Sequence, residues 1–101
     1  MQLTLLAVPG CPSAAAFEEL LADALADYPG VRVDRREIAD ERAAAEAGMC
    51  GSPTLLVNGV DPFAQPGQEP SLSCRLYYDD AGRIVRLPSL EALRRALAAA
   101  S

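Results

Sequence analysis

The chain has 101 residues, a net charge of −5 and three cysteines, with no histidine and nine basic residues that are all arginine. The missing histidine excludes Ser-His-Asp and Cys-His catalysis, HExxH zinc sites and ordinary haem ligation, and the missing lysine excludes Schiff-base chemistry and Walker A loops. The negative charge argues against a nucleic-acid partner, which would require a basic surface to neutralise phosphates.

The length of the chain predicts a single domain over residues 1–101. No apolar run approaches the roughly 20 residues that span a bilayer, so we expect no membrane contact. The apolar run before Cys11 is about six residues long and has no basic residue before it, unlike a secretory signal. We therefore expect a cytoplasmic protein, in which cysteines are more often free, catalytic or metal-binding than joined in structural disulfides.

The first third of the chain predicts a strand, a helix and a second strand. Residues 2–8 are an apolar run typical of a strand buried on both faces. The helix is expected to begin at Pro12 and to end before Pro29-Gly30, which puts Cys11 at or beside its N-cap. Residues 31–38 then predict the second strand. The apolar stripe of the helix recurs at helical spacing: Phe17, Leu20, Leu21, Ala24, Leu25 and Tyr28.

The middle of the chain predicts a short helix and a third strand. Asp40 is the expected N-cap of this helix, and Gly48 is its expected stop. Residues 54–57 predict the strand, which ends in a tight turn at Asn58-Gly59. Three prolines and one glycine in residues 61–70 predict a loop.

Residues 71–78 alternate in polarity and predict a strand. This pattern makes Cys74 a small core residue, and it places one of the rings of Tyr77 and Tyr78 in the core and the other in solvent. The expected apolar face carries Leu72, Cys74, Leu76 and Tyr78.

The last segment predicts a hairpin and a helix. Asp79-Asp80-Ala81-Gly82 is typical of a hairpin turn, after which residues 83–87 return as a strand. Pro88-Ser89 opens the final helix. The other charged residues are interpreted as turn positions or solvated strand ends: Asp61, Asp79, Asp80, Arg35 and Arg36.

The element order is β-α-β-α-β-β(-β)-α, which predicts an α/β fold. The strand-helix-strand start implies a right-handed parallel crossover, and the short connection after the third strand implies antiparallel pairing later. We expect a mixed sheet of four to five strands with helices on both faces.

Two segments carry a resemblance to a known superfamily. Gly10-Cys11-Pro12-Ser13-Ala14 opens the first helix, and Gly51-Ser52-Pro53-Thr54 leads into the third strand about 40 residues later. In this order, and with an element order that covers nearly the whole chain, they resemble the thioredoxin/glutaredoxin superfamily. The string through Asp61-Pro62-Phe63, with Ser73-Cys74-Arg75-Leu76-Tyr77 beyond it, is also similar to small bacterial thioredoxin-like proteins, some of them labelled alkylmercury lyase-like.

The resemblance implies that Cys11 is the nucleophilic thiol and that Pro53 is cis and packs against it. It implies that Pro12 and Ser13 flank the bound substrate, and that the Ser52 backbone groups are free to pair with an extended peptide or thiol substrate. Independently of the resemblance, a cysteine at a helix N-terminus faces unpaired N–H groups and the positive end of the helix dipole, which favours reactivity.

The chain departs from the superfamily at Ala14, where dithiol oxidoreductases have a second cysteine and monothiol relatives have serine. Alanine cannot attack a mixed disulfide, so Cys50, Cys74 or an external thiol would resolve one formed at Cys11. Cys50 lies three residues before Pro53, which allows roughly 10 Å between the two thiols if Pro53 packs on Cys11. Their pairing would require local movement, and a free thiol at Cys50 is the alternative.

Three functions remain open from the sequence. The first is thiol-disulfide exchange at Cys11 with protein or small-molecule thiols and disulfides, without a cofactor. The second is soft-metal or organomercurial binding by Cys11 and Cys50, with Cys74 as a less favoured ligand, because thiolates select soft metals. The third is a non-catalytic binding module that keeps only the fold.

Overall fold

The computed structural model describes all residues from 1 to 101, and it has the α/β architecture that the sequence predicts. No helix has both the length and the apolar character needed to cross a membrane. The helices are α1 (Ala14–Ala24), the 3-10 helix η1 (Leu25–Asp27), α2 (Glu41–Ala47) and α3 (Leu90–Ala100). The strands are β1 (Leu3–Ala7), β2 (Val33–Glu37), β3 (Cys50–Ser52), β4 (Thr54–Val57), β5 (Ser71–Cys74), β6 (Tyr77–Tyr78) and β7 (Ile84–Val85).

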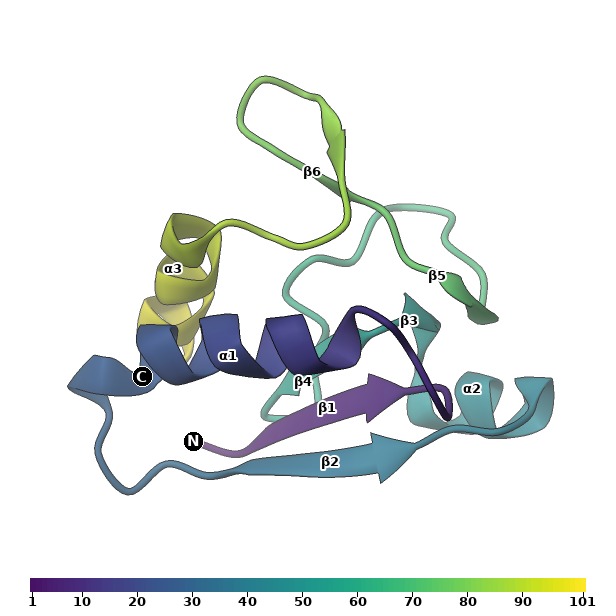
Figure 1. The fold of residues 1–101 in the computed structure, drawn as a ribbon, viewed down its shortest axis with the longest axis horizontal. Coiled ribbons are helices and arrows are strands. Elements are labelled where there is room, and N and C mark those ends of the chain that lie inside the picture. Colours follow the sequence, from purple (N-terminus) through teal and green to yellow (C-terminus); the bar gives the residue numbers. More distant parts are fainter.

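The central sheet has the order β2-β1-β4, with β1 parallel to β2 and antiparallel to β4 (Figure 1). It is mixed, as expected, but it has three strands instead of four to five. The remaining strands form two small sheets, a parallel pair β3-β5 and an antiparallel hairpin β6-β7.

The strands after β4 do not join the central sheet, because the chain turns away from it after β4. The Pro-rich loop carries it to the edge of β3, a three-residue strand that the sequence pattern did not reveal. The expected continuous strand over residues 71–78 is split, since Arg75 and Leu76 separate β5 from β6. The turn at Asp79–Gly82 joins β6 to β7 as predicted.

Helices cover both faces of the central sheet, as predicted. Successive β1 side chains point to opposite faces, so Leu5 faces α1 and α3 while Leu6 faces α2. The first core contains Leu3, Leu5, Phe17, Leu21, Ala24, Leu55, Val57, Tyr77, Leu93 and Leu97. The second contains Leu6, Ile38, Ala44 and Met49.

The ends of α2 follow the sequence prediction, whereas the start of α1 does not. Asp40 accepts the Ala43 N–H at 2.7 Å, and Gly48 ends α2 in the left-handed conformation. Helix α1 begins at Ala14, two residues after Pro12, and its N-cap is Ser13. The expected helix start at Pro12, with Cys11 at the N-cap, is therefore wrong by about two residues.

In residues 74–78, the side chains that were predicted to be buried and those predicted to be exposed are largely exchanged. Cys74 is exposed, as are Leu76 and Tyr78, whereas Arg75 and Tyr77 are each only 4% exposed. The prediction of Cys74 as a core residue is wrong, because it assigned the arginine to solvent by residue type. The prediction that one of the two adjacent tyrosine rings is buried is confirmed.

Candidate functional site

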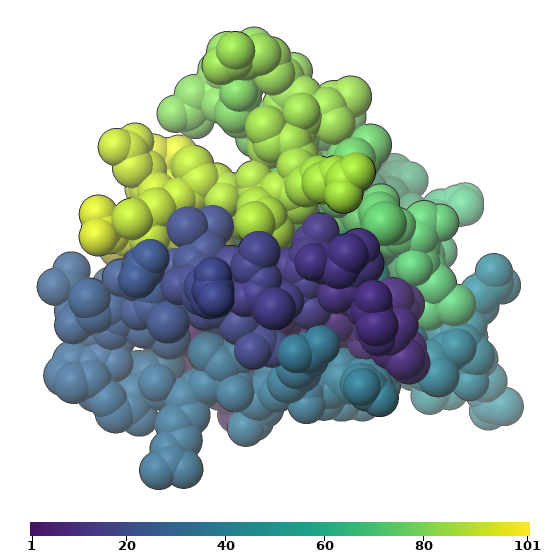
Figure 2. Space-filling model, viewed as in Figure 1, coloured from purple at the N-terminus to yellow at the C-terminus, as the bar shows by residue number.

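Cys11 lies on a tight loop between β1 and α1. Its N–H donates to the Val8 carbonyl at 3.1 Å, and its own carbonyl accepts the Ala14 N–H at 3.3 Å, so two turns precede the helix. Its thiol is free and its residue is partly exposed, between the exposed residues Gly10 and Pro12. The purple segment before α1 reaches the surface in Figure 2. Solvent and small reactants therefore have access to this loop.

Ser52 lies against the loop that carries Cys11, whereas the packing of Pro53 on Cys11 remains a prediction. The Ser52 hydroxyl accepts the Val8 N–H at 3.0 Å, which ties the turn before β4 to the start of the Cys11 loop. The Ser52–Pro53 peptide bond is cis, as the resemblance implied. Both residues are buried, so neither side chain forms an exposed wall beside the thiol.

The carbonyl groups on either side of the Ser52–Pro53 bond already have partners within the chain. The Arg75 N–H donates to the Ser52 carbonyl at 3.0 Å, and the Tyr77 hydroxyl donates to the Pro53 carbonyl at 2.6 Å. The expectation that the Ser52 backbone groups are free for a substrate is therefore wrong, because β5 pairs with this edge of β3.

A buried arginine holds this region together. The Arg75 guanidinium donates to Asp61 at 2.7 Å, to the Thr54 hydroxyl at 3.1 Å and to the Phe63 carbonyl at 2.8 Å. It also lies 4.8 Å from the centre of the Tyr77 ring. Its Nε is buried without a hydrogen-bond partner. A charge in such a setting requires a paired counter-charge, which Asp61 supplies.

Sequence reasoning missed Arg75 and treated Asp61 only as a turn residue. Asp61 does serve the turn, since its carboxylate accepts the Phe63 N–H at 2.9 Å, but its second oxygen binds Arg75. The signal for this pair was one arginine inside an otherwise apolar alternation together with one aspartate that follows a strand closely. Both features are common on solvated surfaces, so the pattern alone did not distinguish burial.

Tyr77 connects the arginine to the cis-proline. Burial raises the pKa of its hydroxyl well above the usual value, the Arg75 charge lowers it in part, and the negative charges of Asp61 and Cys11 raise it further. The phenol therefore stays protonated, and remains a donor to Pro53, at neutral pH.

The other two cysteines differ in their surroundings. Cys50 is partly exposed, and its Sγ lies 3.9 Å from the Gly48 carbonyl. Cys74 is exposed on β5, in register with Ser52. All three cysteines are free, and no group of three or more Cys, Asp or Glu side chains is arranged to hold a metal ion. The roles predicted for Cys50 as a resolving thiol and as a soft-metal ligand remain predictions.

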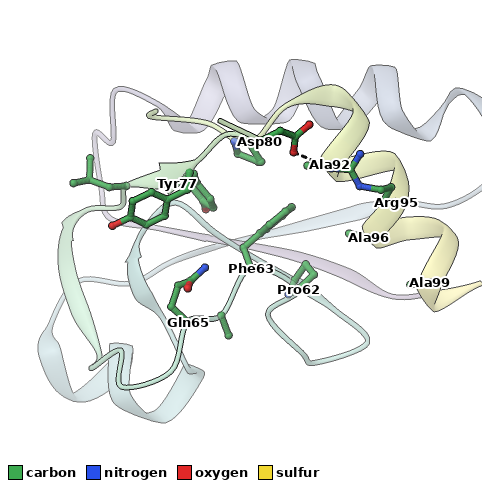
Figure 3. Close-up of a pocket in the computed structure, with 13 residues that line it drawn as sticks. Pro62, Phe63, Gln65, Tyr77, Asp80, Ala92, Arg95, Ala96 and Ala99 are labelled. Carbon is green, nitrogen blue, oxygen red and sulfur yellow. Dashed lines mark ion pairs between the residues drawn. The ribbon is translucent and has the colours of Figure 1, made fainter. Parts of the chain in front are cut away.

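A cavity of about 590 Å³ lies between the loop after β4, strand β6 and helix α3 (Figure 3). Phe63 and Tyr77 line it, with their rings in an edge-to-face contact 5.6 Å apart. The ion pair between Asp80 and Arg95, at 3.5 Å, crosses its rim. Cys11 is not among the lining residues, and the cavity meets the surroundings of Arg75 through Phe63 and Tyr77.

Comparison of the chain with models of known protein families, with curated proteins and with solved structures finds no match. The functional conclusion therefore depends on the geometry around Cys11.

Proposed function

We propose that this chain is a thioredoxin-like thiol protein that performs thiol-disulfide exchange through Cys11. The observation that carries the proposal is a free, partly exposed cysteine on the loop after the central strand β1, with Ser52 hydrogen-bonded to that loop. The start of α1 follows three residues later, and helix N-termini favour nearby negative charge. A thiolate, which is the reactive form of cysteine, is the negative charge available there.

The exchange has two steps. The Cys11 thiolate attacks one sulfur of a disulfide, so that a new S–S bond forms at Cys11, the old S–S bond breaks, and the leaving thiolate takes a proton. An external low-molecular-weight thiolate then attacks the substrate sulfur of the mixed disulfide and releases Cys11 as a thiolate. The net reaction exchanges one thiol for another in a disulfide, with no net change in oxidation.

The side chain at position 14 limits how the mixed disulfide is resolved. Ala14 opens α1 with a methyl group, so no thiol follows Cys11 within the next turn of the chain. Cys50 is the only other partly buried thiol, and its Sγ lies 3.9 Å from the Gly48 carbonyl. We therefore assign resolution to an external thiol and keep Cys50 as the second candidate.

The test measures the reactivity of each cysteine separately. The protein is labelled with iodoacetamide between pH 5 and pH 9, and the alkylated fraction of each cysteine is read by mass spectrometry. We expect Cys11 to react faster than Cys74 at pH 6, although Cys74 is the more exposed of the two. Equal or slower alkylation of Cys11 at this pH would contradict the proposal.

The functional arm uses a small disulfide as substrate and reduced glutathione as the external thiol. We expect turnover to be lost in Cys11→Ser and kept in Cys74→Ser, which serves as the matched control. A drop in turnover in Cys50→Ser, together with a Cys11–Cys50 disulfide found after mild oxidation, would show that Cys50 resolves the mixed disulfide in place of the external thiol. Turnover that persists in Cys11→Ser would refute the proposal.

A further inference from the structure

This inference rests on the proposed function and concerns its substrate class. We propose that Cys11 exchanges with small-molecule disulfides and does not recognise extended peptide disulfides, because strand β5 already pairs with the β-strand edge beside it. An extended peptide binds a protein by adding its backbone to an exposed strand edge. The edge of β3 that carries Ser52 is already filled by β5.

Most carbonyl groups of residues 49–53, the segment that Ser52 ties to the Cys11 loop, are engaged within the chain. Four carbonyls accept hydrogen bonds from the chain itself: Met49 from the Ser71 N–H at 3.0 Å, Gly51 from the Thr54 hydroxyl at 2.7 Å, Ser52 from the Arg75 N–H at 3.0 Å and Pro53 from the Tyr77 hydroxyl at 2.6 Å. Proline has no N–H to offer. An incoming peptide would have to displace an internal partner for each bond that it made.

Within the central sheet, strand β1 offers no free edge to a peptide. Strand β1, which leads into the Cys11 loop, is paired on one side with β2 and on the other with β4. Its edge toward β2 is paired from Leu3 to Ala7, and its edge toward β4 is paired from Leu3 to Leu6. The loop itself is turned back by the Cys11 N–H bond to Val8, so its backbone is not extended either.

Strand β5 is also firmly attached where it covers β3. Arg75, directly after β5, is anchored through its guanidinium to Asp61, Thr54 and the Phe63 carbonyl. The backbone at Gly51 approaches Arg75 so closely that a Cβ at position 51 would lie 2.8 Å from the Arg75 Cβ. Lifting β5 would break the buried ion pair and open this close contact, so displacement by a peptide is costly.

The reachable part of the site is thus the Cys11 thiol and the short exposed loop around it. A small disulfide needs only access to the sulfur and room for a leaving group, and the partly exposed thiol supplies the access. An extended peptide would gain little more, since it finds no backbone partners. We therefore expect that the residues on either side of the cysteine in a peptide disulfide do not raise the rate of exchange with Cys11.

The experiment compares two probes that share one leaving group. The first is bis(2-hydroxyethyl) disulfide, and the second is a neutral eight-residue peptide whose central cysteine is joined to 2-mercaptoethanol. The second-order rate constant of each probe is measured with the Cys50→Ser/Cys74→Ser variant, in which only Cys11 reacts. Each value is then divided by the rate constant of the same probe with N-acetylcysteine. We expect the normalised peptide rate to be no more than threefold above that of the small disulfide, and to rise linearly with concentration.

Cys74 supplies the comparison thiol, because it is exposed and lies on β5, the strand that fills the Ser52 edge. In the Cys11→Ser/Cys50→Ser variant, only Cys74 reacts. The ratio of its rate with the peptide probe to its rate with the small disulfide should equal the ratio measured with N-acetylcysteine. A normalised peptide rate at Cys11 more than tenfold above that of the small disulfide, or one that saturates, would overturn the inference while leaving the exchange function intact. No reaction of Cys11 with either probe would refute the proposed function itself.

Amide hydrogen exchange gives a second readout on the peptide adduct. In the mixed disulfide between Cys11 and the peptide, the Ser71 and Arg75 amides should keep their protection within twofold of the free protein. A loss of protection of more than tenfold at both amides would show that the peptide replaces β5, and this would overturn the inference.

Discussion

At the scale of single residues, Arg75 shows how one charged side chain can organise a site without reaching the reactive atom. Its side chain is 1% exposed, and that of its partner Asp61 is 9% exposed. Breaking a buried pair of this kind leaves an uncompensated charge, whereas exposed pairs contribute little. The pair as a whole is neutral, and its guanidinium lies over the ring of Tyr77, whose hydroxyl donates to the Pro53 carbonyl.

Replacing Asp61 by alanine is expected to lower the free energy of unfolding by about 3–5 kcal/mol, because the Arg75 guanidinium then stays buried without its counter-charge. Urea denaturation followed by circular dichroism measures the change. The exposed pair Arg42–Glu46 is the control, and Glu46→Ala should cost no more than about 0.5 kcal/mol. Equal losses in the two variants would contradict the structural role given to Asp61.

Tyr77 predicts a dependence of stability on alkaline pH. An unfolded tyrosine titrates near pH 10, and burial raises the pKa of Tyr77 above that value. Above about pH 10 the unfolded chain therefore releases a proton that the folded chain retains. The free energy of unfolding then falls with rising pH, by at most about 1.4 kcal/mol per pH unit.

The Tyr77→Phe variant should have a smaller slope of unfolding free energy between pH 9 and pH 11 than the unmodified protein. Its stability at pH 7 should also be lower, because the buried Pro53 carbonyl loses its donor. Tyr78→Phe is the matched control, since Tyr78 is exposed, and it should leave the slope unchanged. An identical slope in all three proteins would show that Tyr77 titrates as it does in the unfolded chain.

At the scale of elements, sequence patterns located the helices well and the small strands poorly. The long stripe of α1 and the Asp40 and Gly48 signals of α2 are local, so they could be read without knowledge of the fold. Strand β3 has three residues, and it exists only because β5 pairs with it from 21 to 22 positions away. Local periodicity contains no information on such a contact.

The same limit applies to the candidate site. The position of Cys11 before a helix followed from local signals and the cis Pro53 from the resemblance, and the structure brings their segments together through Ser52. The occupation of the Ser52 edge by β5 did not follow, because it depends on the burial of Arg75. That burial depends in turn on Asp61, which lies 14 residues away in the chain.

The two helix starts differ in how they are capped, which predicts different responses to mutation. The Asp40 side chain accepts the Ala43 N–H, whereas the Ser13 side chain makes no capping bond at α1. Asp40→Ala should lower the free energy of unfolding by about 1 kcal/mol, and Ser13→Ala by much less. Thermal unfolding of both variants measures the difference, and a larger loss for Ser13→Ala would show that α1 is capped by this serine in solution.

At the scale of the whole molecule, β1 contributes side chains to two hydrophobic cores, one on each face of the central sheet. Leu5 belongs to the core under α1 and α3, and Leu6 belongs to the core under α2. Both side chains are fully buried. Because one strand contributes to both cores, loss of packing on either face weakens the element that supports the other.

Leu5→Ala and Leu6→Ala should therefore each cost about 2–5 kcal/mol, although the second core is much the smaller. Both variants should unfold in a single transition, seen at the same urea concentration by far-UV circular dichroism and by tyrosine absorbance. Two separate transitions in Leu6→Ala would show that α2 and its core melt independently of the rest.

The Arg75 anchor has a consequence for the set of sequences compatible with this fold. One side chain joins Gly51, Thr54, Asp61 and Tyr77, so the residue that is acceptable at any of these positions depends on the others. A buried pair can be exchanged for two apolar residues at little cost, but not one member at a time. Functional sequences drawn from a library randomised at positions 61 and 75 should therefore fall into two groups, one with both charges and one with neither, with few intermediates between them.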